Sequence, residues 1–206
     1  MEIYNSIING INFSVSADKS LISVAQVLFR AIKAIPIETV RDGYKLEIGF
    51  SVFIFIATND GYKIVAPDYS NGPFFNTTDD LTIDLWILLE QTELLKMYGI
   101  EGVSTRFDNE IVIAKNALEN STISLQRYSD LGKGESGWYV EAIEEKPDGT
   151  FKTITTKDYE SFYVYQMLQK RPSLIKALAL PYEYLVVFDG DEISEILNEN
   201  NESIIN

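Results

Sequence analysis

Few side chains in this sequence are of the types that perform covalent chemistry. The chain has no histidine and no cysteine, so no imidazole can activate a serine and no thiolate can attack a substrate or bind a metal. Ser136 lies in Gly134-Glu135-Ser136-Gly137, which is close to the G-x-S-x-G pattern of serine hydrolases without matching it. We interpret this serine as a turn residue, and we expect a protein that binds and is not an enzyme.

A glycine-rich segment has the spacing of a phosphate-binding loop. Residues 132–137 read Gly-Lys-Gly-Glu-Ser-Gly, which matches G-x-G-x-x-G. That pattern binds a pyrophosphate when it opens a helix, because the N-terminus of the helix attracts the anion. Here a strand is predicted to follow, beginning at Trp138. The segment is therefore interpreted as a loop, with a small-ligand-binding regulatory module as the alternative, and no cofactor is expected.

Carboxylates are the one abundant group that could do chemistry. The chain has 31 of them, and Asp189-Gly190-Asp191-Glu192 is the densest group. Its spacing does not fit an EF-hand loop, and Asp191 is predicted to cap a helix, so no metal site is expected. A pair of carboxylates at the right separation can hydrolyse a glycoside. A carboxylate-dependent hydrolase therefore stays open as an alternative function.

Aromatic side chains in or beside loops are the better candidates for binding a partner, because buried aromatic anchors dominate many interfaces. The candidates are Tyr69, Phe74, Phe75 and Tyr128. To these we add Asp189 and Asp191, whose charge could steer a partner. Trp138 begins a strand and is predicted to pack inside the protein.

Charge and hydropathy narrow the class of partner. The formal net charge is −14, and 46% of the residues are apolar, which is typical of a folded globule. A negative surface repels a phosphate backbone, so nucleic acid is not expected as a partner, whereas it would speed association with a basic protein. No apolar run is long enough to cross a bilayer and no signal peptide is evident. We therefore expect a cytoplasmic protein with no membrane partner. The oligomeric state is not predicted.

The elements that must position these residues follow from periodicity and turn residues. Asn9-Gly10 and Asn59-Asp60-Gly61 predict β-hairpins, and alternating apolar residues predict one long strand over residues 44–57. Helices are predicted from about Asp18 to Ile35 and from Leu81 to Tyr98, where Pro36 and Gly99 end them. Further helices are predicted over residues 158–170 and 191–197, and Pro147-Asp148-Gly149 is predicted to join two strands.

This pattern predicts an α+β fold in which antiparallel sheets have helices packed on one face. The domain organisation is expected to be an N-terminal α+β region over residues 1–108, of no type that we can assign, followed by a second α+β domain over residues 109–206. The two could also form one continuous domain.

The second region resembles a known family over about residues 111–190. The matching features are Ile111-Val112-Ile113-Ala114-Lys115-Asn116-Ala117-Leu118, Arg127, Glu135-Ser136-Gly137-Trp138-Tyr139-Val140, Leu168, Pro172, Leu178-Ala179-Leu180-Pro181 and Val186-Val187-Phe188. They resemble a bacterial domain of unknown function marked by (Asp/Glu)-Ser-Gly-Trp and assigned to immunity proteins of polymorphic toxin systems. Many members carry Asp where Glu135 stands.

The resemblance implies a function that the residues alone do not. It implies a protein that binds and neutralises a cognate bacterial toxin by direct protein–protein contact, with the negative charge favouring a basic toxin. From the residues themselves, Gly137 permits unusual dihedral angles, Ser136 can bond a turned backbone, and Trp138 supplies a large anchor. We therefore interpret Arg127, Ser136, Gly137 and Trp138 as structural, and expect the toxin to bind elsewhere.

Overall fold

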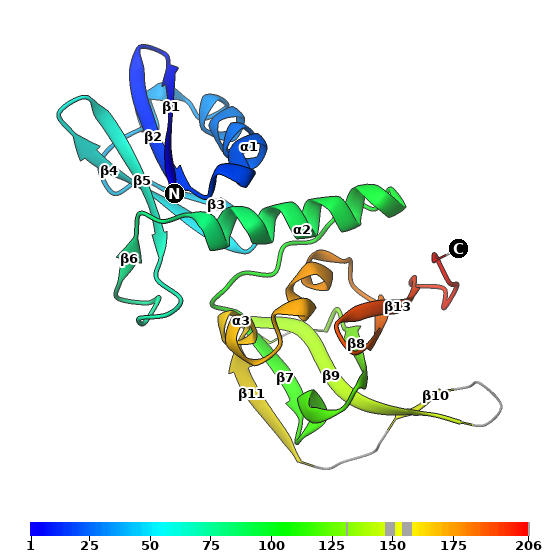
Figure 1. The fold of residues 1–206 in the computed structure, drawn as a ribbon. Helices are drawn as coiled ribbons and strands as arrows, with labels where there is room; N and C mark the ends of the chain where they lie inside the picture. The colour runs from blue at the N-terminus through cyan, green and yellow to red at the C-terminus, as the bar shows by residue number, and fades with distance from the viewer. Residues whose placement is uncertain (131, 147–150, 154–157, 206) are drawn as a thin grey trace. The chain divides into compact units, whose positions relative to one another are not determined.

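The protein folds into two compact units. The structure is a computed structural model that describes residues 1–130, 132–146, 151–153 and 158–205. One unit comprises Met1–Thr92 and the other Glu93–Asn206 (Figure 1). Each unit contains its own β-sheet, and the boundary between the units falls inside a helix, α2 (Thr82–Tyr98). Whether either unit folds alone, as the predicted division at residue 108 implies, stays a prediction.

The sheet of the first unit is mostly antiparallel. Its path is β1-β2-β5-β4-β3, with β6 paired to β5 and one parallel pairing between β2 and β5. The strands are β1 (Glu2–Ile8), β2 (Ile11–Ala17), β3 (Lys45–Ile48), β4 (Ser51–Thr58), β5 (Gly61–Pro67) and β6 (Thr77–Thr78).

Turn residues fix the register of this sheet. Asn9 and Gly10 have φ values of 51° and 81°, as a type I′ turn requires, and they join β1 to β2 in the predicted hairpin. Gly61 is needed for a different reason. A Cβ atom there would lie 2.0 Å from the carbonyl oxygen of Asn12, so only glycine lets the parallel strands β2 and β5 approach.

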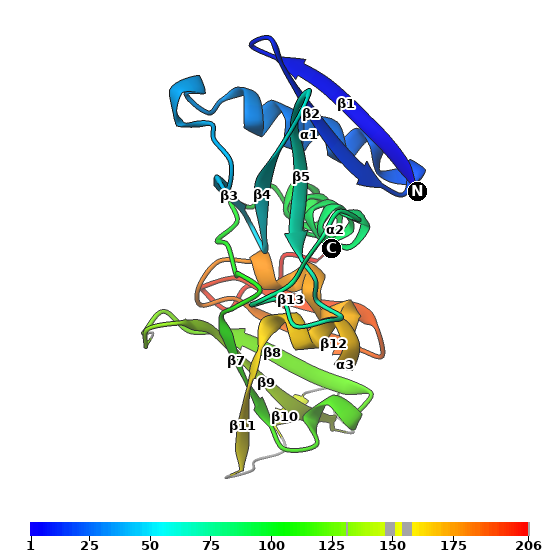
Figure 2. The ribbon, with the colours of Figure 1, turned by 90° about the vertical axis from the view of Figure 1, so that its left-hand side faces the viewer.

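One helix covers a face of the first sheet. The 3₁₀ turn η1 (Lys19–Leu21) leads into α1 (Ile22–Lys33), and Asp18 caps this start by accepting a hydrogen bond from the Ser20 amide. A second 3₁₀ turn, η2, spans Ile37–Thr39. The core between helix and sheet includes Phe13, Val15, Ala25, Leu28, Ile32, Phe53, Phe55 and Ile64. In Figure 2, α1 lies behind β1 and β2.

The sheet of the second unit is also mixed, with β7 and β9 parallel and the other pairs antiparallel. Its path is β11-β7-β9-β8-β12-β13, with β10 paired to β9. The strands are β7 (Glu110–Ala114), β8 (Thr122–Arg127), β9 (Glu135–Glu145), β10 (Phe151–Thr153), β11 (Tyr159–Tyr163), β12 (Leu185–Asp189) and β13 (Glu192–Leu197).

Short helical segments lie over one face of this second sheet. They are η3 (Ala117–Glu119), η4 (Val164–Gln166), α3 (Met167–Lys170) and η5 (Pro172–Ala179). The face that they cover is the apolar one, and its buried side chains include Ile111, Ile113, Ile123, Leu125, Trp138, Val140, Met167, Leu174, Leu178, Val186 and Phe188.

The predicted fold class is confirmed, since helices pack on mostly antiparallel sheets. The hairpins after Asn9-Gly10 and Asn59-Asp60-Gly61 and the helices near residues 22–33 and 82–98 are confirmed as well. In the described part of the chain, no helix is both long and apolar enough to cross a membrane.

Three predicted elements are wrong. Residues 44–57 form two strands, because Gly49 has a φ of 57° and lets β3 fold back on β4. Residues 159–163 form β11 and not a helix, since their aromatic residues suit a strand and pair with β7. Residues 192–197 form β13, because Gly190 turns the chain back against β12. Asp191 therefore caps no helix. The predicted Pro147-Asp148-Gly149 turn lies outside the described residues.

Candidate functional site

The Ser-Gly-Trp segment lies inside the second unit. Trp138 is fully buried and its indole Nε1 donates a hydrogen bond to the Leu178 carbonyl at 3.2 Å. The Ser136 hydroxyl donates to the Glu110 carbonyl at 2.6 Å and accepts from the Trp138 amide at 3.2 Å. Gly137 has a φ of 80°, a conformation that glycine adopts without strain. These contacts tie β9 to β7 and to η5.

Arg127 is the hub of the same interior. Its side chain is buried, and each acceptor that the structure gives it is a backbone carbonyl. Nε donates to Ser136 at 3.1 Å, Nη1 to Val103 at 2.7 Å and Leu180 at 2.6 Å, and Nη2 to Ser104 at 3.2 Å. Five N–H donors in a fixed fork suit such a set of oxygens.

The guanidinium of Arg127 also stacks on aromatic rings. Its Cζ lies 4.6 Å from the ring centroid of Tyr182 and 5.5 Å from that of Trp138, within cation–π range. Burial lowers the pKa of Arg127 to about 10, so the side chain stays charged at neutral pH. A donor that is charged at neutral pH and enclosed by carbonyls holds chain segments together and does not act as a general base there.

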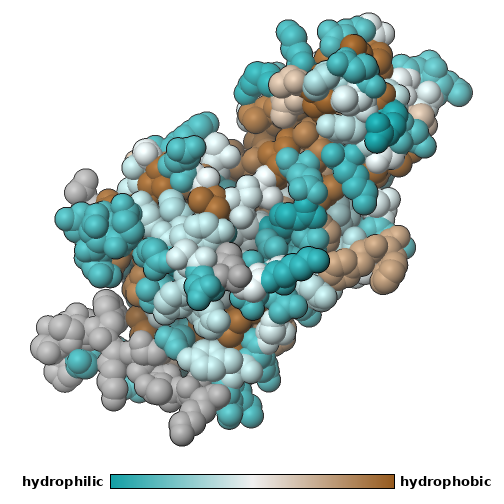
Figure 3. Space-filling view, turned by 180° about the vertical axis from the view of Figure 1, so that it is seen from behind, coloured by the Kyte–Doolittle hydropathy of each residue, from teal (hydrophilic) through white to brown (hydrophobic). Residues whose placement is uncertain are grey.

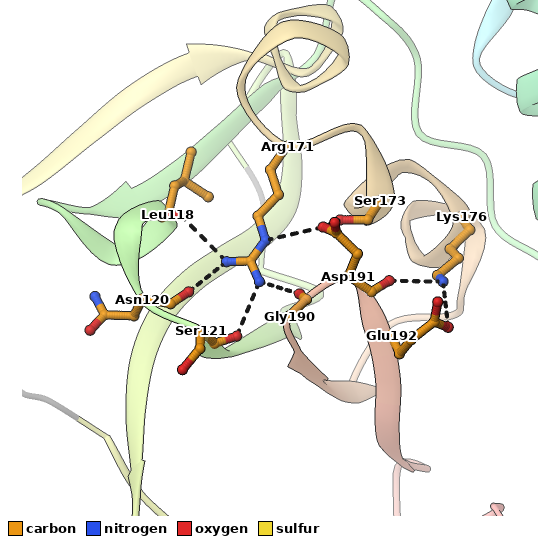
Figure 4. A network of polar contacts seen from close by, with 9 residues as sticks. All are labelled: Leu118, Asn120, Ser121, Arg171, Ser173, Lys176, Gly190, Asp191 and Glu192. Carbon is orange, nitrogen blue, oxygen red and sulfur yellow. Dashed lines mark hydrogen bonds and ion pairs between the residues drawn. The ribbon is translucent and has the colours of Figure 1, made fainter.

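A second arginine network holds the turn between β12 and β13 (Figure 4). Arg171 donates to the carbonyls of Asn120 at 2.8 Å and Ser121 at 3.1 Å, to Leu118 at 3.5 Å, and to Gly190. Its Nε lies 4.0 Å from the carboxylate of Asp191, whose Oδ1 accepts from the Ser173 hydroxyl at 2.7 Å. Burial lowers the pKa of Arg171.

The two predicted acidic contact residues lie at this turn. Asp189 ends β12 and is exposed, and the side chain of Asp191 is also largely exposed, at 78%. Asp191 belongs to the Arg171 network, which gives it a structural use beside any role in binding. Their predicted part in partner binding stays a prediction.

The second sheet has one apolar face covered by helical segments, and its other face carries three tyrosines. Tyr128, Tyr139 and Tyr159 are 41%, 36% and 43% exposed. The Tyr128 and Tyr139 rings lie 5.2 Å apart at 84°, and the Tyr139 and Tyr159 rings 6.5 Å apart at 72°. Such edge-to-face pairs are favourable. We call these three residues, with Glu141, the tyrosine face.

Strand register places these residues together. Gln126 of β8 and Val112 of β7 both pair with Tyr139 of β9, and Ser124 pairs with Glu141. Directly paired residues point to the same side of a sheet. Tyr159 comes from β11, beyond β7, and its hydroxyl donates to Glu141 Oε1 at 2.5 Å.

The tyrosine face surrounds a cavity of about 480 Å³, a volume within the usual range for ligand sites. Its lining residues are Ser124, Gln126, Tyr128, Asp130, Tyr139, Glu141 and Tyr159. Two of them are acids and none is basic. The hydrogen bond to Glu141 raises the pKa of Tyr159 to about 12, and burial raises the pKa of Tyr128. Both hydroxyls therefore remain hydrogen-bond donors at neutral pH.

A second hollow continues along the edge strand β11. It measures about 370 Å³ and is lined by Glu110, Ser161, Phe162, Tyr163, Tyr165 and Gln166. Tyr163 and Tyr165 are stacked with centroids 6.1 Å apart, and the Ser161 hydroxyl donates to Glu110 at 2.9 Å. Like the tyrosine face, this hollow combines aromatic rings with a carboxylate.

The other predicted aromatic residues lie in the first unit, between β5 and β6. Tyr69 is buried and its hydroxyl donates to Asp84 Oδ1 at 2.8 Å. Phe74 is 46% exposed and Phe75 is 92% exposed. The structure therefore places Tyr69 in the interior and leaves the Phe75 ring exposed. The predicted part of Phe74 and Phe75 in partner binding stays a prediction. Brown, apolar surface is visible on this unit at the upper right of Figure 3.

Asp84 is the most unusual carboxylate in the described residues. It is buried, burial raises its pKa to about 6, and its Oδ2 has no hydrogen-bond partner there. Asp68 and Asp80 line the same cavity, which measures about 140 Å³. That volume is below the usual range for ligand sites. Both neighbours also accept local hydrogen bonds, from Ser70 and Thr82. The cavity is thus a poor fit to a hydrolase.

The glycine-rich loop has the geometry expected of a loop. Strand β9 begins at Glu135, so a strand follows the glycines as predicted and no helix does. The Glu135 carboxylate accepts from the Gly132 amide at 2.8 Å, and the Gly134 carbonyl accepts from the Glu110 amide at 2.9 Å. The Glu135 carboxylate thus already accepts the hydrogen bond of a backbone amide that a phosphate would need. Among the described residues, no group of three acids forms a metal site.

Sequence reasoning missed Tyr139, Glu141 and Tyr159 as members of the candidate site. Tyr159 fell in a predicted helix, so its place opposite Glu141 was hidden. The signal that could have found the two residues of β9 is the alternation of side chains between the two faces of a strand. With Trp138 directed into the core, Tyr139 and Glu141 must point the other way.

Comparison with known proteins gives one match. A family model described as the Imm33-like domain matches residues 90–199, which cover the sheet of the second unit, the buried motif and the tyrosine face. No curated protein and no solved structure matches the chain.

Proposed function

The chain belongs to the Imm33-like domain family, an immunity protein family of toxin systems, and from this membership we propose that it neutralises a cognate protein toxin by direct contact. Immunity by contact needs a surface and no catalytic machinery. The observation that carries the proposal is the family match over residues 90–199, and the exposed tyrosine face supplies a surface that suits the task.

The tyrosine face has the composition of a protein-binding surface. Tyrosine contributes large contact area at a small cost in side-chain entropy and is enriched at interface hot spots. The three rings support one another through edge contacts, so they are already ordered before a partner arrives. Preorganised side chains lose less entropy on binding. We place the toxin contact on this face, with Tyr128 as the predicted residue that belongs to it.

Negative charge supports a partner with a basic surface. The chain carries a net charge of −14, and Asp130 and Glu141 line the cavity between the tyrosines. Opposite charges speed diffusional encounter, and they do so less at high salt. We also propose a cytoplasmic location, where the chain would meet a toxin that acts inside the cell.

The test is co-expression with the candidate toxin encoded immediately upstream. Wild-type protein should restore growth and co-purify with the toxin. Tyr139→Ala with Tyr159→Ala should abolish both, whereas Phe75→Ala, which removes an exposed ring from the first unit, should leave both intact.

Two results would change the assignment. If the wild-type chain neither binds nor protects, the proposed function is wrong for that toxin. If Phe75→Ala loses protection and the double tyrosine variant keeps it, the toxin binds the Phe74–Phe75 loop and the tyrosine face is not the contact surface.

A further inference from the structure

The cavity in the tyrosine face has the features of a site for a cation. Aromatic rings carry negative charge on their faces and attract ammonium and guanidinium groups. The Tyr139 ring is nearly perpendicular to both of its neighbours, so the three rings present both faces and edges around the cavity. Glu141 and Asp130 add negative charge, and none of the described residues that line the space is a lysine or an arginine.

Glu141 is held ready to accept a further hydrogen bond. Tyr159 donates to its Oε1, and across the described residues its Oε2 accepts no hydrogen bond. The Tyr159 bond fixes the carboxylate without neutralising it. A fixed and partly shielded carboxylate gives a stronger charge-assisted hydrogen bond than a mobile one in water.

We propose that this cavity receives an arginine side chain of the partner protein. A guanidinium is planar, so it can lie against a tyrosine ring while its edge donates to a carboxylate. Glu141 Oε2 is the expected acceptor, with Ser124 and Gln126 beside it on the cavity wall. Lysine would supply the charge without the flat surface or the paired donors. This inference rests on the proposed function, because it names the group by which the toxin would bind.

The preference of this cavity for an arginine side chain can be measured on the full chain without a toxin. The probe is Nα-acetyl-arginine amide, compared with the neutral citrulline amide and with Nα-acetyl-lysine amide, in an NMR titration that follows backbone amide resonances. The arginine probe should shift the resonances of Tyr139, Glu141 and Tyr159, with a dissociation constant on the order of 10 mM. The citrulline probe should leave them unchanged at the same concentrations.

Two variants that each remove one negative charge test the role of Glu141, one at the proposed acceptor and one at a matched control site. Glu141→Gln removes the proposed acceptor and should weaken arginine binding by about tenfold or more. Glu160→Gln removes one negative charge from an exposed neighbour of Tyr159 whose side chain alternates away from that ring, so it should change binding less than about twofold. Thermal unfolding of each variant shows whether the fold is kept.

Several outcomes would overturn the inference. These are no shift with arginine amide at concentrations up to about 100 mM, roughly ten times the expected dissociation constant, equal shifts with citrulline, equal binding of the lysine probe, or unchanged binding in Glu141→Gln. Failure here is distinguishable from failure of the proposed function. A chain that protects against toxin without binding the arginine probe loses only this inference, whereas one that binds the probe and gives no protection loses the proposed function.

Discussion

Residues 138–142 of β9 alternate between two faces of one sheet, and the two faces do different work. Trp138, Val140 and Ala142 point into the core and are at most 5% exposed, whereas Tyr139 is 36% exposed on the other face. The inward residues meet backbone carbonyls and apolar side chains. The outward ones meet other tyrosines, Glu141 and solvent.

The difference separates what identifies the family from what can bind a partner. Trp138, Ser136 and Arg127, which carry the resemblance, are all buried and hold strands and loops in place. The candidate contact residues occupy the positions between them. Changes on the outer face can therefore alter the partner without disturbing the core, because a strand's two faces pack independently.

The largest effect on stability is expected when the buried positive charge of Arg127 is removed from the inner face. Arg127→Met removes the donors to four backbone carbonyls, and buried acceptors left without partners are costly. We expect the free energy of unfolding to fall by about 4 kcal/mol, measured by urea denaturation followed by circular dichroism. Lys115→Met, an exposed site in the same unit, is the control. Equal stability of the two variants would remove Arg127 from its role as the hub.

A subtler change on the inner face should have about half that effect. Trp138→Phe keeps an aromatic ring, but it loses the bond from Nε1 to the Leu178 carbonyl and leaves a small void. We expect a loss of about 2 kcal/mol in the same measurement. Trp86→Phe, at a half-buried site in the first unit, tests whether the loss follows burial. A Trp138→Phe protein as stable as wild type would contradict this account.

The first unit also contains a buried ionisable side chain, Asp84. Its Oδ2 has no hydrogen-bond partner among the described residues, whereas the Arg127 guanidinium donates to four carbonyls. Burial raises the pKa of Asp84 to about 6 from an ordinary value of 3.8. Between these values the folded state holds a proton that the unfolded state has released, so the stability of the fold decreases as the pH rises from about 4 to 6. Above pH 6 the ionised group remains a net cost.

Asp84→Asn should therefore stabilise the protein at pH 7, by about 3 kcal/mol, and have little effect at pH 4. Urea denaturation at both pH values measures this, with Asp60→Asn at an exposed turn as the control. A destabilised Asp84→Asn protein at pH 7 would mean that the ionised carboxylate is needed for the fold.

The smallest effect on stability is expected on the outer face. Tyr139→Ala with Tyr159→Ala should lower the free energy of unfolding by about 1 kcal/mol or less per residue, since both side chains are exposed. Toxin affinity, measured by calorimetry, should fall about 30-fold or more, because tyrosine side chains at the centre of an interface contribute much of its binding energy. A large loss of stability would show that the outer tyrosines are structural too.

The sequence by itself predicted much of the fold because the signals are local. Asn9-Gly10 defines a hairpin through two positive φ values, and the apolar period of residues 21–35 defines α1. The absence of histidine and cysteine excluded whole classes of chemistry from composition alone. The Ser136-Gly137-Trp138 resemblance indicated an immunity family, and the matching family model agrees.

Local signals failed where partners distant in sequence decide the structure. Residues 159–163 and 192–197 have patterns compatible with more than one conformation, and they became strands because β7 and β12 offered pairing edges. Propensity is weak when tertiary pairing competes with it.

Tertiary structure alone decided the candidate site. Tyr128, Tyr139, Glu141 and Tyr159 come from segments up to 31 residues apart along the chain, and only the strand order β11-β7-β9-β8 brings them to one cavity. The sequence determined which side of β9 each residue faces, because a strand has a period of two. It could not determine which strands lie beside β9, because that depends on how the whole chain buries its apolar surface.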